Sequence, residues 1–168
     1  IRRQRQMCIR DRAEHDPQAL AILITTSETV ADQAVAELEK QVRRLGRQDI
    51  ARTSLQEKGA VLIAATLDEA VELANRIAIE HLELQVDQPW QWLPMIRHAG
   101  AVFLGHNTPE AAGDYLAGPN HVLPTMGTAR FSSALGVETF LKKSSIISYS
   151  RQSLLNDADH IRKLASLE

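Results

Sequence analysis

The residues best suited to do chemistry gather in one run, GDYLAGPNHVLPT at residues 113–125. Its two glycines and two prolines fix unusual backbone angles, which is typical of an ordered loop. The loop carries Asp114 and His121, a carboxylate and an imidazole that suit proton transfer or metal binding. Ordered loops on a rigid scaffold often carry function, although a tight connection with a structural Asp and a capping His fits the same residues.

Two Glu-His pairs, Glu14-His15 and Glu80-His81, add further acid–base candidates, although each pair alone also fits a solvated helix end. The second pair stands where a predicted helix gives way to a strand, so its side chains can point into a cleft. A histidine there suits proton transfer near neutral pH. Histidine and aspartate are ordinary zinc ligands, but the wide spacing of His15 and Asp114 forms no metal motif by itself. The chain has no Gly-x-Gly-x-x-Gly turn and no phosphate loop.

The composition fits one globular domain: 168 residues, of which 44% are hydrophobic and 24% charged. No apolar run approaches the roughly 20 residues of a membrane span, and no signal-peptide pattern is present. The single cysteine, Cys8, excludes an internal disulfide and a multi-cysteine zinc site. We therefore expect a reducing, cytoplasmic environment.

Residues 1–12 differ in character from the rest of the chain. They hold five arginines and one aspartate, without a helical apolar stripe or an aromatic residue that could stack on bases. The run resembles a translated sequencing adapter, so we predict a non-native prefix that packs poorly; a solvated native segment is the alternative. Residues 13–135 are expected to form an incomplete α/β catalytic domain, and residues 136–168 a small, truncated C-terminal segment.

Short apolar runs alternate with helical patterns from residue 19 onward. Buried strands are predicted at residues 19–25, 60–65 and 101–104, the first of them buried on both faces, and a short strand at residues 82–86. Helices are predicted from a Thr25–Glu28 capping box to Gly46, from a Thr66–Glu69 capping box to about Ile79, and over residues 89–98. This β-α-β-α-β order indicates an α/β fold with a partial Rossmann-like, mostly parallel sheet flanked by helices.

The loop at residues 105–124 follows the last of these strands, at the carboxyl edge where ligands bind in such sheets. Beyond it, the β-branched and aromatic residues of 132–149 predict a ribbon or short strands. Ser150 is expected to cap a last helix.

Three runs together resemble the histidinol dehydrogenase family: IAIEHLELQV, AGAVFLG and HNTPEAAGDYLAGPNHVLPTMGTARFSSALGVETFLKK. The resemblance covers about residues 13–168, in order and without large gaps. It implies a zinc-dependent, NAD-linked oxidoreductase of histidine biosynthesis, which converts L-histidinol to L-histidine through an aldehyde. It also implies a homodimer in the full-length protein.

The resemblance assigns roles to individual residues. His81 would take the hydroxyl proton as hydride leaves for NAD, and Glu80 would activate the water that hydrates the aldehyde. His15 and Asp114 match two zinc ligands, with zinc acting as a template for the substrate. Glu110 lies one helical turn before Asp114, where it could orient that ligand. The implied substrate pocket comprises His15, His81, Glu110, Asp114 and His121, which we expect to face one cleft.

The chain also departs from the family pattern. Arg12 stands three residues before His15, where the family carries a zinc-binding Gln, and an arginine has no lone pair to donate. Ile79 replaces a proline that is common before the Glu-His pair. The family continues past this chain with a Glu and a last zinc-binding His that reach the partner's active site, and most NAD contacts are expected in a missing N-terminal half. We therefore interpret the chain as a fragment that is inactive alone.

Two other classes of protein fit the same residues. One is a non-catalytic α/β binding module that retains the fold without a complete metal and cofactor site. The other is a different metal-dependent enzyme that uses the same loop.

Overall fold

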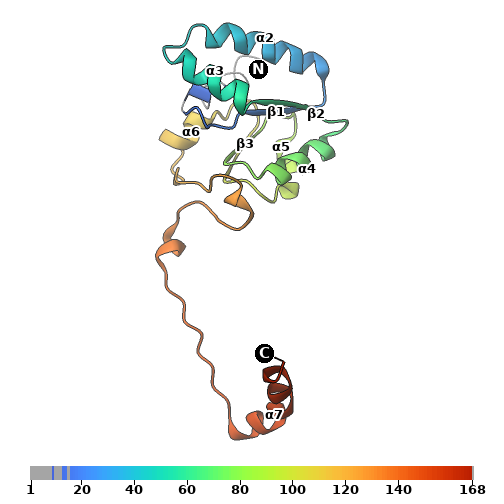
Figure 1. Cartoon of the computed structure of the whole chain (residues 1–168), viewed down its shortest axis with the longest axis vertical. Helices are drawn as coiled ribbons and strands as arrows, with labels where there is room; N and C mark the ends of the chain where they lie inside the picture. Colours follow the sequence, from blue (N-terminus) through green and yellow to red (C-terminus); the bar gives the residue numbers. More distant parts are fainter. Residues whose placement is uncertain (1–8, 10–12, 15, 168) are drawn as a thin grey trace. The chain divides into compact units, whose positions relative to one another are not determined.

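The computed structural model describes residues 9, 13–14 and 16–167 (Figure 1). The chain divides into two compact units, one up to Gly136 and one from Val137 onward. In chain order, the elements are β1 (Ile22–Thr25), α2 (Glu28–Val42), α3 (Gln48–Glu57), β2 (Ala60–Ile63), α4 (Leu67–Ile77), β3 (His81–Leu84), α5 (Pro89–Trp92), the 3-10 turn η1 (Leu93–Met95), β4 (Ala101–Leu104), α6 (Glu110–Tyr115), the 3-10 turns η2 (Thr128–Arg130) and η3 (Val137–Phe140), and α7 (Arg151–Ala165). None of the described helices combines the length and apolarity that crossing a bilayer requires.

The four strands form two parallel pairs. Ile22 of β1 lies opposite Ala60 of β2, and His81 of β3 lies opposite Ala101 of β4. Helices connect the strands of each pair, because parallel strands need a crossover. The predicted α/β class with parallel strands and flanking helices is thus confirmed. Over the described residues, the strands form two two-stranded sheets where one sheet is predicted.

Helices lie on both sides of β1. α2 and α4 both contact β1, from opposite sides (Figure 1). α3, which has no counterpart among the predicted helices, packs beside α2. Their shared core is apolar and consists of buried Ala13, Val42 and Ala51 with the partly buried Leu38, Leu45 and Leu55.

A cavity of about 460 Å³ lies between α2, α3 and the first strand pair. Ile9 is half-buried and lines this cavity. Met7 and most of the predicted prefix lie outside the described residues, so the prefix itself stays a prediction. Val61 of β2 also borders the cavity, and Val61 and Ile63 are exposed. The prediction of a buried strand at residues 60–65 is therefore wrong for the face of β2 that carries Val61 and Ile63, because the helices do not close over it.

Hydrogen bonds from side chains decide where α2 begins. The Ser27 hydroxyl accepts from the Val30 amide at 3.3 Å, so the helix starts at Glu28. Thr25 instead accepts from the Ser27 amide at 3.2 Å, in the turn before the helix. The predicted Thr25–Glu28 capping box is therefore wrong: the chain needs one more turn after β1 before the helix can form.

The predicted cap of α4 is confirmed. The Thr66 hydroxyl accepts from the Glu69 amide at 3.2 Å. The Glu69 carboxylate reaches back and accepts from the Ala65 amide at 2.7 Å, so two backbone donors at the start of the helix are satisfied.

The unit from Val137 onward departs from its prediction. Over residues 141–150 the described chain forms no helix or strand. The predicted ribbon over residues 132–149 is wrong, because β-branched residues stabilise a strand only beside a partner strand, and none of the described residues supplies one. The last helix begins as predicted: the Ser150 hydroxyl accepts from the Ser153 amide at 3.0 Å.

Candidate functional site

The Glu80-His81 pair is fixed by a tight entry into β3. α4 ends at Ile77, and the next residue, Ala78, adopts a left-handed conformation with φ 54° that turns the chain toward the strand. The Glu80 carbonyl then accepts from the Ala101 amide at 2.8 Å. A Cβ at Gly100 would lie 2.6 Å from that carbonyl oxygen, so only glycine allows the two strands to begin side by side. His81 is consequently the first residue of β3.

The segment after β4 folds back over the same strands. Gly105 ends β4 with φ +80°, a conformation that favours glycine. The Thr108 hydroxyl donates to the Leu104 carbonyl at 2.7 Å and holds the turn closed. α6 follows, with Glu110 and Asp114 one helical turn apart on the same side of the helix.

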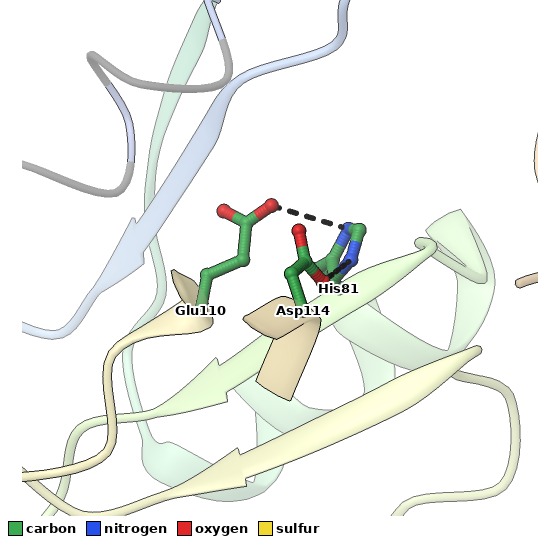
Figure 2. A group of neighbouring side chains, drawn as sticks. All are labelled: His81, Glu110 and Asp114. Atoms are coloured by element: carbon green, nitrogen blue, oxygen red, sulfur yellow. Dashed lines mark ion pairs between the residues drawn. The ribbon is translucent and has the colours of Figure 1, made fainter. Parts of the chain in front are cut away.

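These two carboxylates reach His81 (Figure 2). Asp114 Oδ1 lies 3.7 Å from His81 Nε2, and Glu110 Oε1 lies 3.7 Å from His81 Nδ1. Glu80 Oε1 lies 3.8 Å from the same Nδ1. The His81 side chain is only 7% exposed and that of Glu110 is 13% exposed. The group thus surrounds one buried imidazole with three carboxylates.

The position of this group within the sheet differs from the predicted one. A site at the carboxyl edge of the strands is expected for an α/β sheet. His81 instead lies at the amino end of β3, and the loop that starts at the carboxyl end of β4 brings α6 back across the face of the strands (Figure 2). The loop does leave the carboxyl end of β4 as predicted, but Glu110 and Asp114 lie beside His81 at the amino end of β3 and not at the carboxyl edge.

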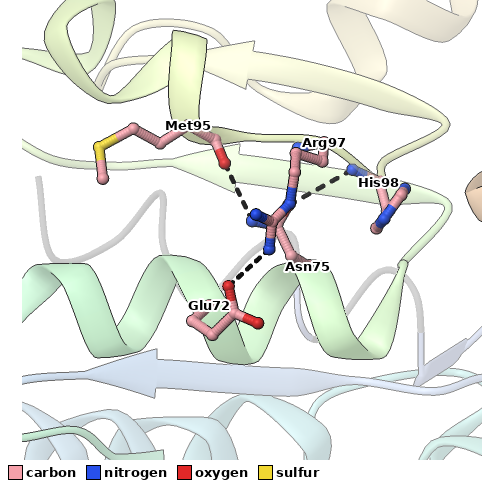
Figure 3. Close-up of polar contacts among 5 residues, drawn as sticks. All are labelled: Glu72, Asn75, Met95, Arg97 and His98. Carbon is pink, nitrogen blue, oxygen red and sulfur yellow. Dashed lines mark hydrogen bonds and ion pairs between the residues drawn. The ribbon is translucent and has the colours of Figure 1, made fainter.

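A buried polar contact fixes the segment that leads into β4. Asn75 of α4 is 3% exposed and donates to the Met95 carbonyl at 2.9 Å (Figure 3). Its side-chain oxygen accepts from the amides of Arg97 at 2.7 Å and His98 at 3.3 Å. One amide side chain therefore anchors the segment between η1 and β4 to α4.

The arrangement can hold a divalent cation. One ligand atom each from His81, Glu110 and Asp114 lie within 4.8 Å of one another. A tetrahedral zinc with bonds of ~2.0–2.2 Å separates its ligand atoms by roughly 3.4 Å. The 3.7 Å between His81 Nε2 and Asp114 Oδ1 is close to that value and longer than a hydrogen bond. The same geometry also suits proton transfer by an imidazole that carboxylates orient.

Comparison with known proteins decides the family. The sequence model of histidinol dehydrogenase matches residues 9–168. The chain belongs to the histidinol dehydrogenase family. The match begins inside the twelve residues predicted to be a prefix.

The relatives of this family member are longer than the chain itself. It is 65% identical over 156 residues to "Histidinol dehydrogenase" of Desulfotalea psychrophila, and 56% identical over 156 residues to that of Nitratidesulfovibrio vulgaris. Each match covers 93% of this chain and 36% of the relative. The crystal structure of histidinol dehydrogenase from Elizabethkingia anophelis matches with a TM-score of 0.83 and 30% identity, over 99% of this chain and 38% of that one. The chain thus spans little more than a third of the length of these histidinol dehydrogenases.

Four of the residues predicted for the site lie together in this family member, namely Glu80, His81, Glu110 and Asp114. His121 is exposed on the loop after α6 and is not part of the group of ligand atoms around His81. His15 lies outside the described residues. The assignment of both histidines to a substrate pocket stays a prediction.

Two residues that lie beside the group are absent from the sequence predictions. Phe103 of β4 places its ring beside that of His81, with ring centroids 5.8 Å apart. Gly113 of α6 lies against the Phe103 ring, next to its Cε1 and Cζ atoms. A glycine inside the short helical run EAAGDY is a sequence signal for close approach, but it does not say what approaches.

Proposed function

We propose that the complete protein containing this chain is a zinc-dependent, NAD-linked histidinol dehydrogenase. It oxidises L-histidinol to L-histidine through histidinal. The observation that supports the proposal most directly is the contact of His81 with Asp114 and Glu110, in a chain that belongs to this family. A buried imidazole that neighbouring carboxylates orient suits the role of a general base.

In this proposal His81 accepts the hydroxyl proton of histidinol. Glu110 and Asp114 lie near opposite ring nitrogens and favour the imidazolium that forms. Glu80, which lies next to His81, accepts a proton from the water that adds to the aldehyde. The two neighbouring bases thus act at different stages: His81 on the alcohol in the first oxidation, and Glu80 on the water that prepares the aldehyde for the second.

The proposal assigns zinc to a carboxylate of α6. Asp114 would hold it together with His15, and Glu110 would orient Asp114 from one helical turn away. When bound, zinc would fix the substrate and polarise its oxygen.

NAD would accept the hydride in both oxidations. The chain has no glycine-rich dinucleotide turn after a strand, so the proposal assigns none of its residues to NAD. The homodimer that the family resemblance implies and the cytoplasmic location expected from the single cysteine belong to the same proposal. Light scattering on the complete protein tests the dimer.

A zinc titration with and without histidinol tests the proposed function. The complete protein should bind zinc, and histidinol should tighten that binding, because linked ligands strengthen each other. It should also produce NADH when histidinol is added. Zinc binding that ignores histidinol would favour a different metal-dependent enzyme, and the absence of both effects would favour a binding module.

The chain alone provides a second measurement. We propose that residues 1–168 by themselves do not oxidise histidinol, since Arg12 cannot bind zinc and no residue is assigned to NAD. Histidinol-dependent NADH production by the chain alone would contradict this part of the proposal.

A further inference from the structure

Phe103 and His81 share one face of the second strand pair. In the parallel register, His81 lies opposite Ala101 and Glu83 lies opposite Phe103. Side chains two residues apart along a strand point to the same side, and so do those of directly paired residues. The Phe103 ring, which is 6% exposed, therefore lies diagonally next to His81, at 35° to its ring plane.

α6 rests on the same ring through a residue without a side chain. A Cβ at Gly113 would lie 2.6 Å from Phe103 Cε1, closer than carbon atoms can pack, and 3.0 Å from Cζ, which is already tight. Glycine is disfavoured inside helices by roughly 1 kcal/mol relative to alanine. The close approach to Phe103 explains why a glycine stands there.

α6 is short and has no side-chain cap at its start. The helix has only six residues, and Pro109 at its start provides no side-chain cap. Gly113 is the residue before Asp114 and lies one turn after Glu110. The distance between the Gly113 backbone and the Phe103 ring thus determines how close both carboxylates come to His81.

We propose that Phe103 is a positioning residue and that its ring, seated between His81 and the Gly113 backbone, sets the separation between the imidazole and the carboxylates of α6. This inference rests on the proposed function for its catalytic consequence. The ring acts as a spacer: it packs beside His81 and holds α6 where Glu110 and Asp114 each lie 3.7 Å from the imidazole. Catalytic groups must be held within about 0.5 Å of their working geometry, which a packed aromatic ring can do.

The test inserts a methyl group into the contact. Gly113→Ala must push α6 away from the ring, whereas Gly46→Ala is a matched control because no atom lies within 4 Å of the added Cβ. Phe103→Leu removes the Cε1 and Cζ atoms that the methyl would meet. The double variant Gly113→Ala with Phe103→Leu should therefore restore the approach of α6.

We expect Gly113→Ala in the complete protein to lower kcat by about 10–100-fold, the cost of displacing a catalytic group by about 1 Å. KM should change less than kcat, zinc affinity should fall, and the unfolding midpoint should stay near that of Gly46→Ala. The double variant should recover most of the lost kcat and zinc affinity. If the two substitutions instead multiply their losses, or if the losses follow the unfolding midpoint, Phe103 is only a core residue and the inference is wrong.

Crystal structures of the variants separate this inference from the proposed function. The distance from His81 Nε2 to the Asp114 carboxylate should increase in Gly113→Ala and return in the double variant. An unchanged distance in Gly113→Ala would overturn the positioning role, whatever the activity. If the wild-type protein does not oxidise histidinol, the proposed function fails, while these distances still decide the role of Phe103. Should Gly113→Ala not fold, Phe103→Leu alone decides: an unaltered distance and zinc affinity would overturn the inference.

Discussion

The two strand pairs of the first unit have the same size and pairing, yet different contacts hold them. The core pair, β1–β2, lies beside an apolar cluster of α2 and α3, and Ser54 of α3 donates a buried hydroxyl bond to the Ala19 carbonyl at 2.9 Å. The site pair, β3–β4, is fixed by directional contacts: the Asn75 amide, the Thr108 hydroxyl, and the close approaches at Gly100 and Gly113. Apolar packing stabilises a pair of strands, but hydrogen bonds and backbone contacts fix atoms at defined distances. A strand pair that carries catalytic groups needs hydrogen bonds and close backbone contacts, because those groups must lie at defined distances.

The largest expected difference between the two pairs concerns the rate of the proposed reaction. In the complete protein, His81→Asn should lower the rate of NADH production by about 10²–10⁴-fold, because it removes a general base. Zinc content should not change. Ile22→Val, at the matching first position of the core pair, should leave the rate within about twofold. Steady-state kinetics measure both variants, and full activity of His81→Asn would exclude it as the base.

The next largest effect should be on zinc binding. Asp114→Ala should weaken zinc affinity by at least the roughly 10–100-fold that loss of an outer-shell partner costs, because it removes a ligand itself. Asp87, an exposed carboxylate after β3, is a matched control, since its Asp87→Ala variant removes a charge of the same sign away from the group around His81. Zinc titrations of the purified variants measure the effect. Equal affinities for the two variants would remove Asp114 from the metal site.

Asn75 tests the directional contacts of the site pair. Asn75→Ala should lower the free energy of unfolding by ~1–3 kcal/mol, because it leaves the Met95 carbonyl and two backbone amides without their buried partner. Glu72→Ala removes the neighbouring ion pair to Arg97, whose side chains are more than half exposed, and should cost less than about 1 kcal/mol. Urea unfolding measures both. A larger loss for Glu72→Ala would reverse the assigned importance of the two contacts.

The smallest expected effect lies in the core pair. Ser54→Ala should destabilise by about 1 kcal/mol, since a buried hydroxyl bond between α3 and the entry to β1 is lost. Thr53→Ala, next to it, removes only an exposed bond within the helix to Asp49 and should stay within about 0.5 kcal/mol of wild type. Neither substitution should alter zinc affinity. A change in zinc affinity would mean that the core pair also positions the site.

Local sequence patterns predicted elements well where the deciding contacts are local. The AVFL strand is observed at its predicted bounds, and the caps at Thr66 and Ser150 are observed as predicted. The same patterns failed where a distant partner decides. The β-branched run over 132–149 found no partner strand, and α3 formed from residues 48–57 without a predicted signal because its face packs on α2.

The sequence by itself determined the family and which residues are candidates for the chemistry, because the Glu-His pair and the GDYLAGPNHVLPT run are short, specific patterns that need no distances. Only the tertiary structure decided that Asp114 and Glu110 reach His81, that they do so at the amino end of β3, and that Phe103 lies beneath them. Caps and periodicity act over a few residues, within one element. The distance between two side chains on different elements depends on strand register and on how closely the backbones approach. Gly113 lets α6 approach Phe103 because it has no side chain that would meet the ring.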